Sequence, residues 1–93
     1  MKILQSRSFE NKVRKFTKQE KKVLDSQVHK IAKKTSIGEE KKGDLRGVFV
    51  HKFKIKSTQS LLSYRFNGDD LELIMTGPHE NYYRDLKSYL KAK

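Results

Sequence analysis

The chain has 93 residues, of which 34% are hydrophobic and 35% charged, and it contains no cysteine. This length predicts one domain over residues 1–93, and the lack of cysteine excludes disulfides and thiolate metal sites. The net charge of +11 favours nucleic acid, an anionic membrane or an acidic protein as the partner. No apolar run approaches the roughly 20 residues of a membrane span, and the first residues lack a signal-peptide pattern. We therefore expect a soluble, cytoplasmic protein that does not bind membranes.

The pattern of apolar residues predicts a strand followed by two helices in the first third of the chain. Residues 3–8 are typical of a short strand, and Ser8 is a candidate N-cap for a helix with the apolar face Phe9, Val13 and Phe16. Thr17 and Glu20 have the spacing of a capping box, which predicts the start of a second helix. The two helices are expected to be antiparallel, with a tight corner between them.

The second half of the chain predicts an antiparallel sheet and a last helix. Residues 35–47 are turn and surface types and are expected to form a loop. The apolar period then changes to two, which predicts strands over residues 48–55, 61–66 and 71–76. An Asn-Gly pair at 67–68 predicts a hairpin turn, and apolar residues at helical spacing over 82–90 predict a helix packed on the sheet. The order indicates an α+β domain.

Polar and aromatic side chains follow the last predicted strand, after a Gly-Pro turn. His79 can exchange a proton near neutral pH, and an exposed ring at Tyr82 or Tyr83 can stack on a nucleobase. Because the two tyrosines are adjacent, a helix cannot bury both equally. The structural alternatives are a histidine bonded to backbone at a helix start and two tyrosines at the edge of the core.

Charged side chains also lie on the predicted strands. Alternation places Lys52 and Lys54 on one face, either solvated or holding phosphates, and His51 on the other, where a structural histidine is the common outcome. Arg65 can hold a phosphate through a bidentate contact. The three histidines lack ligand spacing, so we expect no metal and no cofactor.

Four segments together resemble the RelE/ParE superfamily of bacterial toxins from type II toxin–antitoxin systems. They are Lys42-Gly43-Asp44-Leu45-Arg46-Gly47, Val50-His51-Lys52-Phe53-Lys54, Leu61-Leu62-Ser63-Tyr64 and the ending at residues 76–86. The resemblance covers nearly the whole chain and implies a RelE-like fold: an N-terminal strand, two antiparallel helices, a three-stranded antiparallel continuation of the sheet and a C-terminal helix.

The ending is more similar to the RelE and YafQ ribonuclease toxins than to the ParE gyrase poisons. YafQ-like toxins carry a histidine after the Thr-Gly of the last strand and an aromatic four residues on, which His79 and Tyr83 match. Their strand histidine resembles His51, and the strand lysines of RelE resemble Lys52 and Lys54. The resemblance implies metal-independent mRNA cleavage on the ribosome by the ribose 2′-hydroxyl. His79 and His51 would exchange protons, Tyr83 would stack, and the RNA contacts would come from Lys52, Lys54, Arg65 and Tyr82.

The chain departs from the family pattern at two positions, one of which is an aspartate that YafQ has shortly after its strand histidine and that this chain lacks. RelE places an arginine three residues before the strand tyrosine, where this chain has Leu61. A ParE-like gyrase inhibitor and an RNA-binding domain without catalysis therefore remain alternatives. The resemblance also implies an acidic, partly disordered antitoxin as partner, besides mRNA and the ribosome, and contact with operator DNA only through that antitoxin.

Overall fold

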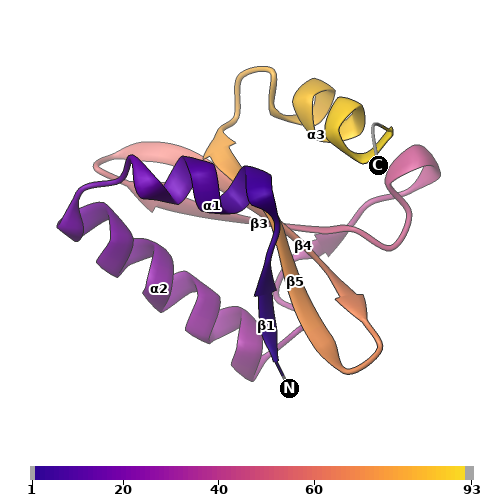
Figure 1. Ribbon diagram of the computed structural model, residues 1–93. Coiled ribbons are helices and arrows are strands. Elements are labelled where there is room, and N and C mark those ends of the chain that lie inside the picture. The colour runs from indigo at the N-terminus through magenta and orange to yellow at the C-terminus, as the bar shows by residue number, and fades with distance from the viewer. Residues whose placement is uncertain (1, 92–93) are drawn as a thin grey trace.

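The computed structural model describes residues 2–91 as a five-stranded mixed sheet with helices packed on it (Figure 1). The elements are β1 (Ile3–Gln5), α1 (Arg7–Arg14), α2 (Lys18–Lys33), β2 (Glu39–Glu40), a 3-10 turn (Gly43–Leu45), β3 (Phe49–Ile55), β4 (Thr58–Asn67), β5 (Asp70–Pro78) and α3 (Tyr82–Lys91). The strand order is β1-β5-β4-β3-β2, with β1 parallel to β5 and the other pairs antiparallel. The predicted α+β class is confirmed, but residues 35–47, expected to form a loop, contain β2 and the 3-10 turn, so the sheet has one more strand than the sequence predicts. Within the described residues, no helix has both the length and the apolarity needed to cross a membrane.

The two faces of the sheet carry separate buried clusters. Leu61 and Leu62 are neighbours on β4 but belong to different clusters, because successive side chains of a strand point to opposite faces. One cluster joins α1 and α2 to the sheet through Phe9, Leu24, Ile31, Phe53, Leu62, Tyr64, Leu71 and Leu73. The other joins the 3-10 turn and α3 to the sheet through Leu45, Val48, Val50, Leu61, Ile74, Tyr82 and Leu86. A polar site built from side chains of the sheet therefore lies on one face of the sheet or on the other.

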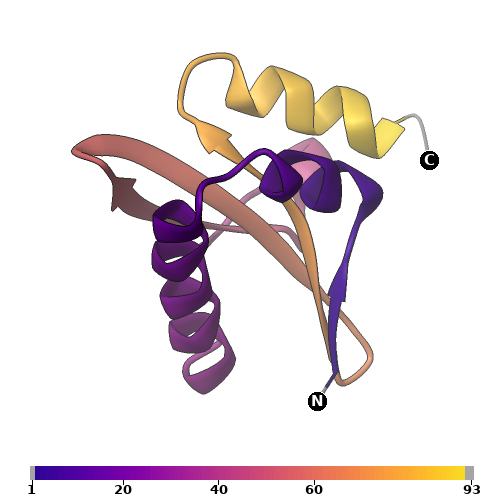
Figure 2. The ribbon, with the colours of Figure 1, turned by 60° about the vertical axis from the view of Figure 1, so that its left-hand side comes forward.

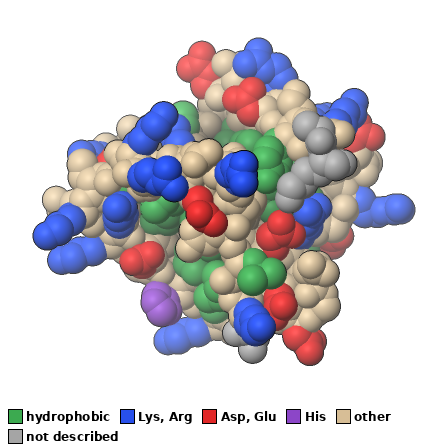
Figure 3. Space-filling view, viewed as in Figure 1, with side chains coloured by type: hydrophobic (Ala, Val, Ile, Leu, Met, Phe, Trp, Pro, Cys, Tyr) green, Lys and Arg blue, Asp and Glu red, His purple; other side chains and the backbone are tan. Residues whose placement is uncertain are grey.

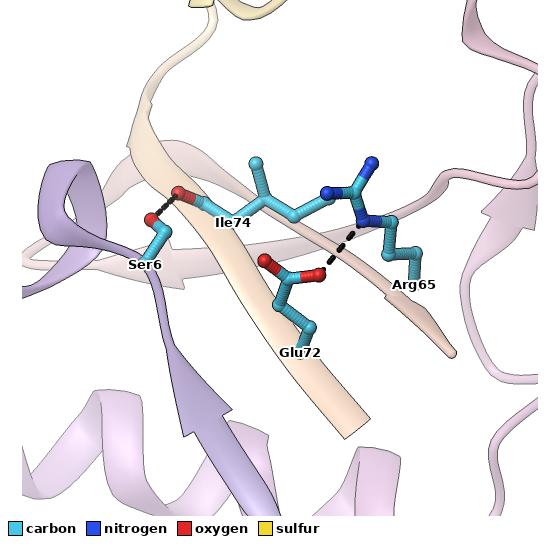
Figure 4. Close-up of polar contacts among 4 residues, drawn as sticks. All are labelled: Ser6, Arg65, Glu72 and Ile74. Carbon is cyan, nitrogen blue, oxygen red and sulfur yellow. Dashed lines mark hydrogen bonds and ion pairs between the residues drawn. The ribbon is translucent and has the colours of Figure 1, made fainter. Parts of the chain in front are cut away.

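The first helix begins two residues earlier than the sequence predicts. Ser6, not Ser8, is the N-cap: its hydroxyl accepts the Phe9 N–H at 3.0 Å and donates to the Ile74 carbonyl at 2.5 Å (Figure 4). The hydroxyl thus satisfies a helix-end amide and a carbonyl of β5 together. The capping box of Thr17 at the start of α2 is confirmed.

The Tyr64 side chain anchors the loop that leads from α2 into β2. Its hydroxyl accepts the Gly38 N–H and donates to the Thr35 carbonyl, each at 2.9 Å. The phenol lies so close to Gly38 that a Cβ there would be 2.6 Å from the hydroxyl oxygen. A glycine is therefore needed for the loop to reach Tyr64, and this contact fixes where the following residues, including Lys41, leave the loop.

We expect Gly38→Ala to destabilise the protein by about 1–3 kcal/mol, because the added methyl forces the loop away from Tyr64. Gly77→Ala is the matched control, since a Cβ there would meet no atom closer than 3.9 Å, and should change the free energy of unfolding by less than about 0.5 kcal/mol. Urea unfolding measures both. Equal stability of the two variants would contradict the close contact.

Candidate functional site

The turn between β5 and α3 brings His79 and Tyr83 together. Asn81 takes a positive φ of 60°, which asparagine tolerates, and the Tyr82 N–H donates to the His79 carbonyl at 3.1 Å. The imidazole then packs edge-on against the Tyr83 ring, with centroids 5.9 Å apart and planes at 79°. His79 is exposed and Tyr83 is half-buried. The histidine and the aromatic that the sequence singled out are thus direct neighbours facing solvent.

Tyr82 lies in the core, which corrects the expectation that it contacts RNA. The side chain is only 3% exposed. Its hydroxyl donates to the Met75 carbonyl at 2.6 Å and is hydrogen bonded to the Ser63 hydroxyl at 2.8 Å. Burial raises the pKa of the phenol, so it remains a neutral donor. Its ring has no free face for a base, and its role is to hold α3 on the sheet.

Lys41 joins the His79–Tyr83 pair from a different part of the chain. Its Nζ lies 5.1 Å from the centroid of the Tyr83 ring, in a cation–π position. The Glu39 carboxylate lies 2.5 Å from the same nitrogen, and this contact raises the pKa of the Lys41 ammonium, which the Tyr83 hydroxyl also supports. The Lys41 side chain is therefore positively charged next to the Tyr83 ring.

Sequence reasoning missed Lys41 because it falls in a stretch of turn and surface residues. The pairing of Glu39 with Val50 and the hydrogen bond from the Lys41 N–H to the Val48 carbonyl place it beside α3. No local pattern reveals either contact. The only signal in the sequence is its position just before the loop segment that resembles the toxin family.

Lys52 and Lys54 lie on the α3 face of the sheet, as alternation predicts. They follow Val50, which is buried under α3, at two-residue spacing along β3. The charge of Lys52 contributes to lowering the pKa of the Glu39 carboxylate, after the larger effect of Lys41, so Lys52 lies near the Glu39–Lys41 pair. Lys54 is one step farther along the same exposed row.

His51 lies on the opposite face, towards α2. Its Nε2 is 2.7 Å from the Gln27 side-chain oxygen, and its ring stacks on Phe53 with centroids 6.1 Å apart. Burial lowers the pKa of this imidazole, and the nearby charge of Lys30 lowers it further. The structure therefore separates His51 from His79 by the thickness of the sheet and gives it structural partners.

Arg65 also lies apart from His79. Its Nε donates to the Glu72 carboxylate at 2.8 Å (Figure 4). Pro78 pairs with Ser60, five residues before Arg65 on β4, so the arginine is roughly 16 Å farther along the strand. Leu61, at the position of the family arginine, is fully buried. Among residues 2–91, no three histidine or carboxylate side chains gather as a metal-ligand set.

Comparisons with known proteins place this geometry in a family. A family model described as the ParE-like toxin of type II bacterial toxin–antitoxin systems matches residues 3–87. A mutant of the E. coli toxin RelE in the free state is similar, with 14% identity and a TM-score of 0.72 over 99% of this chain and 97% of that one. A chain of the intact E. coli RelBE toxin–antitoxin complex is also similar, with 16% identity and a TM-score of 0.67 over 85% and 96%. No curated protein sequence matches significantly. At these identities the structural likeness establishes the fold.

The His51 environment predicts a pH dependence of stability. Because its pKa is lower in the folded state than the usual 6.5, the unfolded chain binds the proton more readily, and stability falls as pH drops below about 6.5. His51→Gln keeps a hydrogen-bonding side chain but cannot titrate, so it should lose less stability over this range. Chemical unfolding between pH 5 and 7.5 measures the difference. Parallel curves for the two proteins would contradict a lowered pKa of the half-buried His51.

Proposed function

The chain belongs to the ParE-like toxin family of type II bacterial toxin–antitoxin systems, and on this premise we propose that it is a RelE-like endoribonuclease that cleaves mRNA on the ribosome. The observation that carries the proposal is the cluster of His79, Tyr83 and Lys41, with Lys52 beside it, on the α3 face. It combines a proton-exchanging group, an aromatic ring and two cations. These are the groups that metal-independent RNA cleavage requires.

The reaction needs no outside nucleophile, because the ribose 2′-oxygen attacks the adjacent phosphorus. A bond forms between that oxygen and phosphorus, the bond from phosphorus to the 5′-oxygen breaks, and a cyclic phosphate results. One group accepts the 2′-hydroxyl proton and another supplies a proton to the leaving oxygen. His79 is the residue of the cluster suited to one of these transfers, and solvent water, which reaches this exposed side chain, makes the other.

The other members of the cluster act on the substrate by position and charge. The half-buried Tyr83 ring stacks on a base next to the scissile bond, and its edge contact holds the His79 imidazole beside that base. Lys41 and Lys52 stabilise the negative charge that builds on the phosphate oxygens. Because its pKa is raised, Lys41 keeps its charge throughout. Lys54 extends the cationic row along the strand, whereas His51 and Arg65 are left out of the proposed set.

Removing the His79 imidazole should abolish toxicity without unfolding the protein. The side chain is exposed, and general acid–base catalysis contributes about 10²–10⁴-fold to such a reaction. We expect His79→Ala to restore growth on induction and to remove codon-phased cuts in primer extension on a cellular transcript. His29→Ala, which removes an exposed histidine from α2, is the control and should remain toxic. A folded His79→Ala that cleaves at the wild-type rate would refute the proposed role.

Loss of the Lys41 charge should slow mRNA cleavage far more than loss of the Lys42 charge. Loss of a charge-assisted contact to phosphate costs about 1.5–3 kcal/mol, so Lys41→Gln should slow cleavage of ribosome-bound mRNA by about ten- to a hundredfold. Lys42→Gln removes the same charge one residue away, where the side chain is exposed, and should have little effect. Cleavage rates of the purified variants provide the comparison. Equal rates would remove Lys41 from the catalytic set.

Inhibition of DNA gyrase is the second candidate function. It is favoured by the ParE-like family model and by the buried Leu61 at the position of the RelE arginine. A DNA damage response on induction, without cuts in cellular transcripts, would support this function. Unimpaired growth without an antitoxin would exclude both toxic activities and leave a plain RNA-binding domain.

We also propose that an acidic antitoxin neutralises this chain. The similarity to a chain of the RelBE complex and the net charge of +11 both support such a partner. Electrostatic steering would speed its association, and added salt should weaken the complex. Contact with operator DNA would then occur only through the antitoxin.

A further inference from the structure

A second cationic surface lies in a groove between α1 and α3. Figure 2 shows α1 passing beneath α3, and Figure 3 shows hydrophobic side chains in the hollow between them, with Lys and Arg crowding the neighbouring surface over α1 and α2. The groove has a volume of about 520 Å³. One wall is α1, the floor is Met75 and Thr76 of β5, and Tyr89 of α3 stands on the other side.

The α1 wall of this groove carries three cations and no acid. Arg7, Asn11 and Lys15 repeat at four-residue spacing, and Lys12 lies beside them, on a stripe separate from the apolar one that enters the core. Within residues 2–91, none of the three cations takes part in an ion pair. Ion pairing within the protein therefore does not account for these three cations, and their charges are available to an anionic ligand.

The groove continues towards the candidate catalytic site. Lys12 also lines an adjoining hollow that includes Gly77 and Pro78, and its Cε would lie 3.9 Å from a Cβ at Gly77. His79 is the next residue after Pro78. The adjoining hollow is lined by Lys12 and Lys56 and also by Glu20, so its lining is mixed in charge, and it reaches the end of β5 one residue before His79.

We propose that this groove binds the backbone of single-stranded RNA, with Arg7, Lys12 and Lys15 on phosphates and Tyr89 against a base. Arg7, Lys12 and Lys15 are five and three residues apart, which corresponds to about 7.5 Å and 4.5 Å along a helix axis and suits neighbouring phosphates of an extended strand. An aromatic ring opposite a row of cations is the usual arrangement of single-strand binding surfaces, and it favours RNA over an acidic peptide. That the bound strand leads to His79 rests on the proposed nuclease function, whereas binding in the groove does not.

The test uses a fluorescent oligouridylate in which every ribose 2′-hydroxyl is methylated, so that binding is measured without cleavage. The combined variant Arg7→Ala, Lys12→Ala and Lys15→Ala is compared with Lys21→Ala, Lys33→Ala and Lys34→Ala, which removes three exposed charges from α2 and its end. Loss of three phosphate contacts should reduce the slope of log K against log salt by about 2. The α2 variant should retain the wild-type slope. Equal losses in the two variants would overturn the proposal.

Tyr89 provides a second, independent measurement. Tyr89→Leu should weaken binding of the same probe by roughly fivefold or more, whereas Tyr89→Phe should bind as the wild type does, because it keeps the stacking surface. Thermal melting confirms that both variants are folded. If the α1 variant binds the probe normally but loses binding to polyglutamate, the groove is a protein site and the RNA proposal fails. If groove variants lose the probe while native RNA is never cut, the groove proposal stands and the nuclease proposal fails.

Discussion

The burial of Tyr82 is the constraint on which both proposed RNA surfaces depend. Its hydroxyl binds the Met75 carbonyl and the Ser63 hydroxyl, and so fixes the first turn of α3 against β4 and β5. Because α3 is held there, Tyr83 is left on the outer side against His79 and Lys41, and Tyr89 two turns later forms a wall of the groove. The buried Tyr82 phenol thereby fixes the positions of the half-buried rings of Tyr83 and Tyr89.

The sheet places the candidate functional side chains of β3 on two opposite faces. On the α2 face, the imidazole of His51 is bound to Gln27 and loses basicity through burial. On the α3 face, Lys52 remains near the Glu39–Lys41 pair. Two histidines can act on one phosphate only if both reach it, and a strand that alternates its side chains prevents that here. The proposed site therefore relies on one imidazole and on cations.

The short helix α1 packs its apolar side chains into the core and presents its cationic side chains on the surface. Phe9 packs into the cluster under α2, whereas Arg7 and Lys15 face the groove beside α3. The Ser6 cap ties the start of this helix to the Ile74 carbonyl of β5 (Figure 4), which forms part of the same strand as the groove floor. The Ser6 cap therefore fixes the position of the cationic side chains of α1 relative to β5, the strand that ends at the candidate site.

Features that depend only on neighbouring residues could be predicted from the sequence. The capping box at Thr17 and the hairpin turn after Asn67 are local hydrogen-bond and backbone preferences, and both formed, with Gly68 and Asp69 as the two turn residues. Alternation likewise assigned His51 and Lys52 to opposite faces, because the side-chain period of a strand is two. The α+β order follows from the same periodicities.

Features that depend on contacts between distant segments arise in the folded chain and could not be predicted from the sequence. Ser6 became the helix cap because the Ile74 carbonyl, 68 residues away, accepts its hydroxyl. Lys41 joined Tyr83 through the register of β2 with β3, and Arg65 met Glu72 through the register of β4 with β5. Strand register and the packing of α3 arise from long-range pairing, which no local pattern encodes, and this is why the composition of the candidate site could be only partly predicted.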